Sequence, residues 1–235
     1  GVGGREIGYL FGQYRKLRGA YENGVLTGKA RSFGGSLIRP EATGFGAVYY
    51  LESVMKHEHD TLEGKTVAVA GFGNVAWGVV QKLSELGAKP VTLSGPDGYI
   101  YDPDGITTKE KFDFMLEMRA SGRNKVQDYA DKFGCKFVAG DKPWGEKVDI
   151  IMPCATQNDV DLTQAKRIVA NNIKYYIEVA NMPTTNEALR FLMDQKNMVV
   201  APSKAVNAGG VLVSALEMSQ NSERISWTSA LSGVR

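Results

Sequence analysis

The sequence has few of the residues that build disulfides, metal centres and membrane spans. It holds two cysteines, Cys135 and Cys154, and two histidines among 235 residues. The cysteines form no CxxC pair, which excludes a disulfide framework and a cysteine-rich zinc site and fits a reducing, cytoplasmic compartment. No apolar run approaches the roughly 18 residues that a membrane span needs, and no signal peptide is recognisable, so we expect no membrane partner.

A strong excess of charge of one sign is also absent. The chain has 28 Lys and Arg against 26 Asp and Glu, a formal net charge of +2. A balance this close to neutral argues against nucleic acid as a partner. The length suits one large domain or two small ones. Because the chain lacks an initiator methionine and a helix stop signal before its end, we expect a segment of a longer protein.

The first part of the chain predicts two helices joined by a flexible segment. Residues 5–18 predict an amphipathic helix. Its apolar stripe consists of Ile7, Leu10, Phe11, Tyr14 and Leu17. A glycine-rich connector follows over residues 19–37, and a second helix starts with Pro40 at or near its first position and runs to about His57.

Beyond residue 65, short apolar strands alternate with helices. Strands are predicted at 66–70, 90–94, 148–153, 174–180 and 198–202, with a further short one at 99–101. Helices are predicted at about 74–86, at 107–133 with a break at Ser121-Gly122, and at 162–171, 186–194 and 203–219. The alternation predicts an α/β, Rossmann-like fold with a mostly parallel open sheet and helices on both faces.

The strongest local motif is GFGNVA at residues 71–76, which follows a buried strand and opens a helix. Gly71 permits the tight turn, Gly73 lets a pyrophosphate approach the backbone, and Ala76 is small enough for the helix to pack on the strand. Free N–H groups and the helix dipole would hold the phosphates. The motif predicts dinucleotide binding; the competing interpretation is a tight turn that merely needs small residues.

One acidic residue decides which dinucleotide is expected. Asp97 lies two residues after the end of the second strand, where a carboxylate would bind the ribose hydroxyls. No Arg or Lys occurs between Pro90 and Thr108, so a 2′-phosphate would lack a cation partner. NAD is therefore favoured over NADP. The alternative for Asp97 is an ordinary Pro-Asp-Gly turn residue.

Polar or small residues follow each of the later strands, at 154–158, 181–183 and 203–210. In an open α/β sheet the ligand lies outside the carboxyl ends of the strands, so these loops are expected to line the cofactor. Two other features are interpreted as structural. His57 and His59 lie at a polar helix end without a third ligand cluster, which predicts no metal site. Cys154 lacks a nearby histidine and is read as a small buried thiol.

Six stretches carry a family resemblance: GVGGREIGY, GGSLIRPEATGFGAVYY, VAGFGNVAWG, IIMPCATQND, EVANMPTT and SKAVNAGGVLVSALEMSQN. Together they resemble the hexameric glutamate dehydrogenases of the small bacterial type, from Gly1 to about Trp227. The resemblance implies oxidative deamination of L-glutamate to 2-oxoglutarate and ammonia, with the hydride going to NAD. It also implies a homohexamer for the full-length protein.

The resemblance further implies roles for single residues. Those matched to the nicotinamide half of the cofactor are Thr43, Ala155, Thr156, Gln157, Asn181 and Asn207, and Asn74 matches the family's fingerprint asparagine on the same cofactor. Those matched to the adenosine side are Phe72, Val75, Pro96 and Asp97, next to Gly71 and Gly73 of the phosphate turn. Those matched to the substrate carboxylate end, across the cleft, are Arg39, Val211 and Ser214.

In the family, the catalytic lysine, the substrate-binding lysines and the catalytic aspartate lie upstream of the position that is Gly1 here. The resemblance therefore implies no catalytic residue in this chain, which alone is expected to be inactive and a monomer or weak dimer. The implied division is 1–36 as helix and connector of the substrate and assembly domain, 37–228 as the dinucleotide-binding domain, and 229–235 as a truncated end or cloning remnant. The alternatives are a non-catalytic nucleotide-binding module and a leucine- or phenylalanine-type amino acid dehydrogenase.

Overall fold

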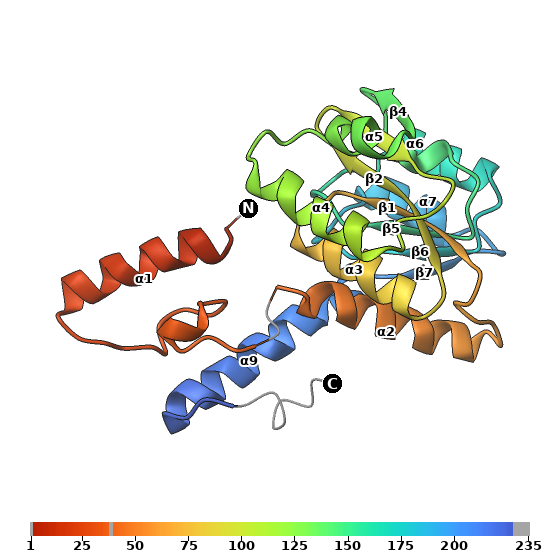
Figure 1. Cartoon of the computed structure of the whole chain (residues 1–235). Helices are drawn as coiled ribbons and strands as arrows, with labels where there is room; N and C mark the ends of the chain where they lie inside the picture. The colour runs from red at the N-terminus through yellow and green to blue at the C-terminus, as the bar shows by residue number, and fades with distance from the viewer. Residues whose placement is uncertain (1, 38–39, 228–235) are drawn as a thin grey trace.

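A seven-stranded sheet with helices on both faces forms the centre of the computed structural model, which describes residues 2–37 and 40–227 (Figure 1). The strands are β1 (Thr66–Ala70), β2 (Lys89–Gly95), β3 (Gly98–Tyr101), β4 (Lys136–Ala139), β5 (Ile150–Pro153), β6 (Tyr175–Ile177) and β7 (Val199–Ala201). Their order across the sheet is β4-β3-β2-β1-β5-β6-β7. Strands β2, β1, β5, β6 and β7 run parallel, and β3 is antiparallel to both its neighbours. The predicted fold class is confirmed.

Most of the helices surround this sheet, whereas α1 and the later part of α9 lie away from it (Figure 1). They are α1 (Gly4–Arg18), α2 (Ala42–His57), α3 (Asn74–Glu85), α4 (Lys109–Ala120), α5 (Gln127–Phe133), α6 (Leu162–Ala170), α7 (Asn186–Met193), α8 (Ser203–Val206) and α9 (Ala208–Glu223). Short 3-10 turns, η1 (Arg31–Phe33) and η2 (Pro143–Gly145), lie in the connections. Within the described ranges, no helix combines the length and the apolar character that crossing a membrane requires.

Strand β1 shows why both faces of the sheet are covered. Successive side chains of a strand point to opposite faces. Val67 and Val69 join the cluster that holds the buried side chains of α2 and α3, whereas Ala68 and Ala70 join the one that holds those of α6 and α7. Because all four side chains are fully buried, the strand reads as a continuous apolar run instead of an alternating one.

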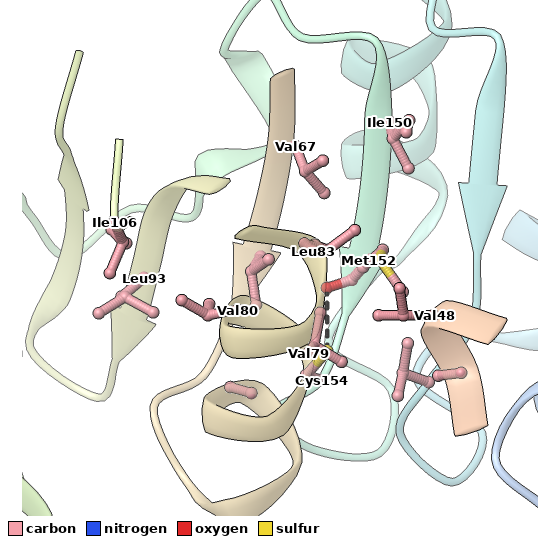
Figure 2. Close-up of a cluster of buried hydrophobic side chains, with 14 of the residues drawn as sticks. Val48, Val67, Val79, Val80, Leu83, Leu93, Ile106, Ile150, Met152 and Cys154 are labelled. Atoms are coloured by element: carbon pink, nitrogen blue, oxygen red, sulfur yellow. Dashed lines mark hydrogen bonds between the residues drawn. The ribbon is translucent and has the colours of Figure 1, made fainter. Parts of the chain in front are cut away.

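The larger of the two cores lies between the sheet and helices α2 and α3. Figure 2 shows Val67 of β1 and Ile150 of β5 with Val79 and Leu83 of α3 in this cluster. Each of these side chains is fully buried. This packing fixes the start of α3 relative to the end of β1, which is where the glycine motif lies.

Glycines let helix α2 approach two other helices at backbone distance. A Cβ placed on Gly44 would lie 2.5 Å from the backbone nitrogen of Val79 in α3. A Cβ on Gly46 would lie 2.9 Å from the Cα of Gly209 in α9. Both distances are shorter than real Cβ contacts, so α2 is held tightly between α3 and the start of α9.

The N-terminal segment lies to one side of the sheet, next to α9 (Figure 1). Of the predicted apolar stripe on α1 only Phe11 is buried, against the rings of Tyr21 and Phe33. Leu10 and Leu17 are 53% and 77% exposed. The stripe is therefore formed as predicted, with Ile7 and Tyr14 half-buried and with Leu10 and Leu17 left uncovered by the described residues.

Two details of the predicted element pattern are wrong. The last helix, predicted at 203–219, is two helices, because the chain turns at Asn207 between α8 and α9. Helix α2 begins at Ala42 after an N-cap at Glu41, so Pro40 lies near the helix start as predicted, two residues before the first helical position. The sequence reading also missed β4, a short edge strand that pairs with β3 and keeps its side chains exposed or half-buried.

Candidate functional site

The strand order places a candidate site at the carboxyl ends of β1 and β5. From β1 the chain proceeds to β2 on one side, and β5 pairs with β1 on the other side, so the strand order reverses between them. In open α/β sheets ligands bind in the crevice at such a reversal. The two loops meet there: a Cβ on Gly71 after β1 would lie 3.2 Å from the Cα of Ala155 after β5.

The turn between β1 and α3 has the geometry of a phosphate-binding turn. Gly71 adopts φ +87°, a left-handed conformation that favours glycine, and its N–H donates to the Ser94 hydroxyl at 2.9 Å. Gly73 is the extended N-cap of α3. The first N–H groups of a helix have no acceptor within it, so this end of α3 offers donors to an anion. Ala76 is fully buried, as expected for the third small position.

Unlike Gly71, Gly73 has a backbone conformation that does not require glycine. Its φ of −77° and ψ of −169° are extended and suit any residue. Apart from the adjoining backbone and its two chain neighbours, no atom of the described residues lies within 4 Å of a Cβ placed on it, and the residue is exposed. The fold itself therefore gives no reason for glycine here. The missing side chain leaves the approach to the N-terminus of α3 open.

Two of the residues predicted for the adenosine side, Phe72 and Asp97, lie together at the end of β2. A Cβ on Gly95 would lie 3.0 Å from the Phe72 ring and 2.7 Å from the Asp97 carboxylate. The Asp97 carboxylate accepts the backbone N–H groups of Val126 and Gln127, each at 3.0 Å. Asp97 thus holds the start of α5, which the sequence did not indicate. Its role toward a ribose stays a prediction.

The loops after β5, β6 and β7 are joined by hydrogen bonds. The N–H of Asn158 donates to the Met182 carbonyl at 2.9 Å, which ties the β5 loop to the β6 loop. The Asn207 side-chain amide donates to the Asn181 side-chain oxygen at 2.7 Å, which ties the β6 loop to the β7 loop. The predicted residues Thr156 and Gln157 are exposed on the first of these loops. The structure thus brings Asn181 and Asn207 together at one edge.

Thr43, the remaining cofactor-side prediction, lies in the first turn of α2. Its neighbour Gly44 approaches the motif helix, with 2.6 Å between an added Cβ and the carbonyl oxygen of Val75. Its other neighbour, Ala42, approaches the start of α9. The Ala42 carbonyl oxygen would lie 2.3 Å from a Cβ added to Gly209. The first turn of α2 therefore contacts both the phosphate turn and the start of α9.

The residues predicted for the substrate are not gathered by the described part of the chain. Val211 lies on α9 and is 71% exposed, and Ser214 follows about one turn later, half-buried. Arg39 lies outside the described residues. Their predicted role therefore stays untested.

The reactive-looking residues have structural surroundings. Cys154 is buried at the end of β5, its thiol donates to the Met152 carbonyl at 3.4 Å, and burial raises its pKa (Figure 2). A thiol kept protonated is a poor nucleophile. No group of three or more His, Cys, Asp or Glu side chains in residues 2–37 and 40–227 is arranged to hold a metal ion.

Sequence reasoning passed over one buried acidic side chain at this edge. Glu178 follows β6 and is 2% exposed. One of its carboxylate oxygens accepts the N–H of Ser203, the first residue of α8, at 3.0 Å. The signal that could have found it is a glutamate inside the otherwise apolar run YYIEVA, where a charge needs a partner.

Comparison with known proteins identifies relatives over nearly the whole chain. A family model described as Glutamate/Leucine/Phenylalanine/Valine dehydrogenase matches residues 34–231. The NAD-specific glutamate dehydrogenase of Clostridium symbiosum is 82% identical over 228 residues, which are 97% of this chain and 51% of that protein. The NADP-specific glutamate dehydrogenase of Escherichia coli (strain K12) is 48% identical over 227 residues, 97% of this chain and 50% of that protein.

Solved structures show the same similarity in three dimensions. A glutamate dehydrogenase structure with 82% identity superposes with a TM-score of 0.95 and covers 98% of this chain and 51% of its own. The Plasmodium falciparum glutamate dehydrogenase, 43% identical, superposes with a TM-score of 0.91 and covers 99% of this chain and 50% of its own. The chain thus spans about half the length of the relatives it matches.

Proposed function

The chain belongs to the glutamate/leucine/phenylalanine/valine dehydrogenase family, and from that premise we propose that it is the dinucleotide-binding half of an NAD-dependent glutamate dehydrogenase. The observation that carries the proposal is Gly73. The fold leaves open space where its side chain would be, directly at the N-terminus of α3. A pyrophosphate fits this space because it needs both free N–H donors and close access to the backbone.

Each part of the site has a task in this proposal. The first N–H groups of α3 bind the pyrophosphate, and the adenosine lies on the side of Phe72 and Asp97. Thr43, Asn181 and Asn207 orient the nicotinamide at the ends of β6 and β7. Bound NAD would supply the hydride acceptor for oxidation at the α-carbon of L-glutamate. In this division residues 37–228 bind the cofactor, whereas residues 1–36 belong with the substrate and assembly domain.

This chain is expected to be inactive by itself. Deamination needs a base for the ammonium group and the attacking water, and a cation for the developing carbonyl. By the resemblance, those groups lie upstream of Gly1. A purified chain should therefore bind cofactor without oxidising glutamate.

The expected cofactor preference is for NAD. Asp97 at the end of β2 would repel a 2′-phosphate, and no Arg or Lys between Pro90 and Thr108 would attract one. Relatives named NAD-specific are 82%, 55% and 54% identical to this chain, one named NAD(P)-specific is 55% identical, and those named NADP-specific are 48% identical. Glutamate is favoured over leucine or phenylalanine as substrate because the relatives at 82% and 55% identity are named glutamate dehydrogenases.

The variant Gly73→Val tests the proposal with little risk to the fold. The backbone of Gly73 is extended and an added side chain meets open space, so the variant should fold. The valine would occupy the pyrophosphate position, and we expect NAD affinity to fall more than about tenfold, equivalent to about 1.4 kcal/mol. Calorimetry measures the affinity, and circular dichroism checks the fold.

Gly12→Val is the matched control, since Gly12 lies on α1 and also has open space around it. It should bind NAD as the parent chain does. A folded Gly73→Val protein with unchanged NAD affinity would refute the assignment of the phosphate turn.

A further inference from the structure

Glu178 is a buried carboxylate to which the proposed function assigns no task. It is 2% exposed, and its backbone N–H donates to the Ala201 carbonyl at 3.1 Å, next to the end of β7. Its Oε2 accepts the N–H of Ser203 at 3.0 Å. Its Oε1 is buried and has no hydrogen-bond partner among the described residues. A carboxylate with a hydrogen-bond partner for only one of its two oxygens costs free energy to bury. This cost indicates that the carboxylate has a role in the structure around it.

The partner of Glu178 is a helix that cannot stand alone. Helix α8 has four residues, Ser203–Val206, which is a single turn. One turn fixes several backbone dihedrals for very few hydrogen bonds, so its formation is unfavourable without outside contacts. The Glu178 carboxylate supplies a charge-assisted hydrogen bond to the first N–H of this turn, where negative charge is also favoured.

The far end of α8 carries a residue of the candidate site. Asn207 ends α8, and its side chain donates to the Asn181 oxygen at 2.7 Å. Asn181 lies three residues after Glu178 in the same segment. The contacts therefore form a closed loop that runs from Glu178 to Ser203, along α8 to Asn207, and back to Asn181. Glu178 is thus connected to both asparagines through hydrogen bonds and the short helix α8.

We infer that Glu178 is a positioning residue: by anchoring α8 it holds Asn207 and Asn181 where the nicotinamide half of the cofactor binds. The inference rests on the proposed function, since it requires that the loops after β6 and β7 face the nicotinamide. Glu178 itself does not touch the cofactor in this arrangement. Its effect is specific to one half of the ligand, because the phosphate turn lies on β1 and α3.

Comparing NAD with ADP-ribose distinguishes a positioning role of Glu178 from a general effect on the stability of the fold. ADP-ribose contains every part of NAD except the nicotinamide, so it reports on the phosphate turn and the adenosine side alone. In Glu178→Ala the Ser203 N–H loses its acceptor, and we expect NAD to bind about tenfold more weakly while ADP-ribose changes less than about twofold. In Glu178→Gln a carbonyl oxygen can still accept this N–H, and both affinities should stay near those of the parent.

Glu146→Ala is the control, because Glu146 accepts the Tyr99 hydroxyl at 2.7 Å at the opposite end of the sheet. It should leave the NAD to ADP-ribose ratio unchanged. If Glu178→Ala does not fold, Glu178→Asp is used instead, because it keeps the charge but shortens the side chain by one methylene. We again expect NAD binding to weaken while ADP-ribose binding stays nearly unchanged.

Calorimetry gives outcomes that separate the two proposals. Equal weakening of both ligands, or unchanged NAD binding in a folded Glu178→Ala or Glu178→Asp chain, overturns the positioning role. A parent chain that binds ADP-ribose and NAD equally well also overturns it, since the nicotinamide then has no site here to be positioned. A parent chain that binds neither ligand refutes the proposed function, and this inference with it.

Discussion

At the scale of single residues, the same residue type has different tasks at different positions. Gly71 is required by its left-handed backbone, Gly44 by its 2.5 Å approach to α3, and Gly73 by neither. Asp97 shows the same point for a charged residue. Its carboxylate is in the place expected for a ribose ligand, yet both oxygens already accept backbone N–H groups of the α5 start.

Removing the Asp97 carboxylate should therefore have two effects. In Asp97→Ser we expect a lower Tm, because the two N–H groups at the start of α5 lose their charged acceptor. We also expect the preference for NAD over NADP to fall several-fold, roughly the loss of one like-charge repulsion at short range. Thermal unfolding and calorimetry with both cofactors measure these effects.

Asp104→Ser is the control for charge, since Asp104 is an exposed acidic residue of the same turn-rich segment. It should keep the cofactor preference of the parent chain. If the parent chain binds NAD and NADP equally, Asp97 has no part in the discrimination.

Asp60 gives a prediction for the dependence of stability on pH. The Thr61 N–H at 2.9 Å, the Tyr175 hydroxyl at 2.9 Å, and the Lys65 and Lys174 ammonium groups hold the pKa of the Asp60 carboxyl well below its usual value. The carboxylate thus stabilises the folded state above the unfolded pKa of about 3.9, and this contribution is lost as pH falls toward the folded pKa.

The Tm of Asp60→Asn should therefore lie below that of the parent by a constant amount from about pH 8 to about pH 5, and the gap should narrow below about pH 4. Thermal scans across this range measure it. A gap that widens on acidification would contradict the assigned direction of the pKa shift.

At the scale of elements, α9 connects two parts of the molecule. Its first turn packs on α2 through Gly209, whereas its later turns bury Glu217, Gln220 and Asn221. The Lys29 ammonium pairs with the Glu217 carboxylate at 2.6 Å, with both side chains fully buried, and the Gly28 N–H donates to the same carboxylate at 2.9 Å. The connector before α2 is thus held on α9 by a polar contact that excludes water.

Replacing Lys29 alone should detach the connector before α2 from α9. Lys29→Met leaves the Glu217 carboxylate buried and unpaired, a change that typically costs about 3–5 kcal/mol. We expect amide hydrogen exchange in residues 26–35 to accelerate more than about tenfold, as measured by mass spectrometry. Lys29→Met combined with Glu217→Gln should restore slow exchange, because the amide oxygen still accepts the Gly28 N–H and no charge is left unpaired. Equal exchange in the single and double variants would argue against the ion pair as the anchor.

At the scale of the whole molecule, the described chain exposes apolar side chains on α1 and α9. On α1, Tyr9, Leu10 and Leu17 are 72%, 53% and 77% exposed, and on α9 Val211 and Leu212 are 71% and 62% exposed. Exposed stripes of this kind favour contact with another chain or domain. For the full-length protein we propose a homohexamer, with the assembly contacts made mainly outside residues 37–228.

The 235-residue chain by itself should be a monomer or weak dimer, with α1 making any dimer contact. Light scattering coupled to size-exclusion chromatography measures the mass, and a stable hexamer would contradict the expectation. Deletion of residues 1–18 tests the contact, because a dimer that persists after the deletion must use another surface.

The sequence alone determined the features that depend on local rules. Apolar periodicity reports burial, so the alternating strands and helices and the mostly parallel sheet were predicted correctly. A tight turn with close backbone approach needs small residues at fixed spacing, so the sequence also indicated the tight turn at 71–76 between β1 and α3. A resemblance of whole motifs pointed to the family, which the family match over residues 34–231 confirms.

Only the tertiary structure decided which distant residues meet. Strand β4 is short and half-exposed, and it is a strand because β3 pairs with it, which no local pattern reports. Asn207, at the break between α8 and α9, donates to a partner 26 residues away, and the buried Glu217 pairs with Lys29, 188 residues earlier. Side-chain polarity is visible in a sequence, but the partner that permits a polar group to be buried is chosen by the packing of the whole chain.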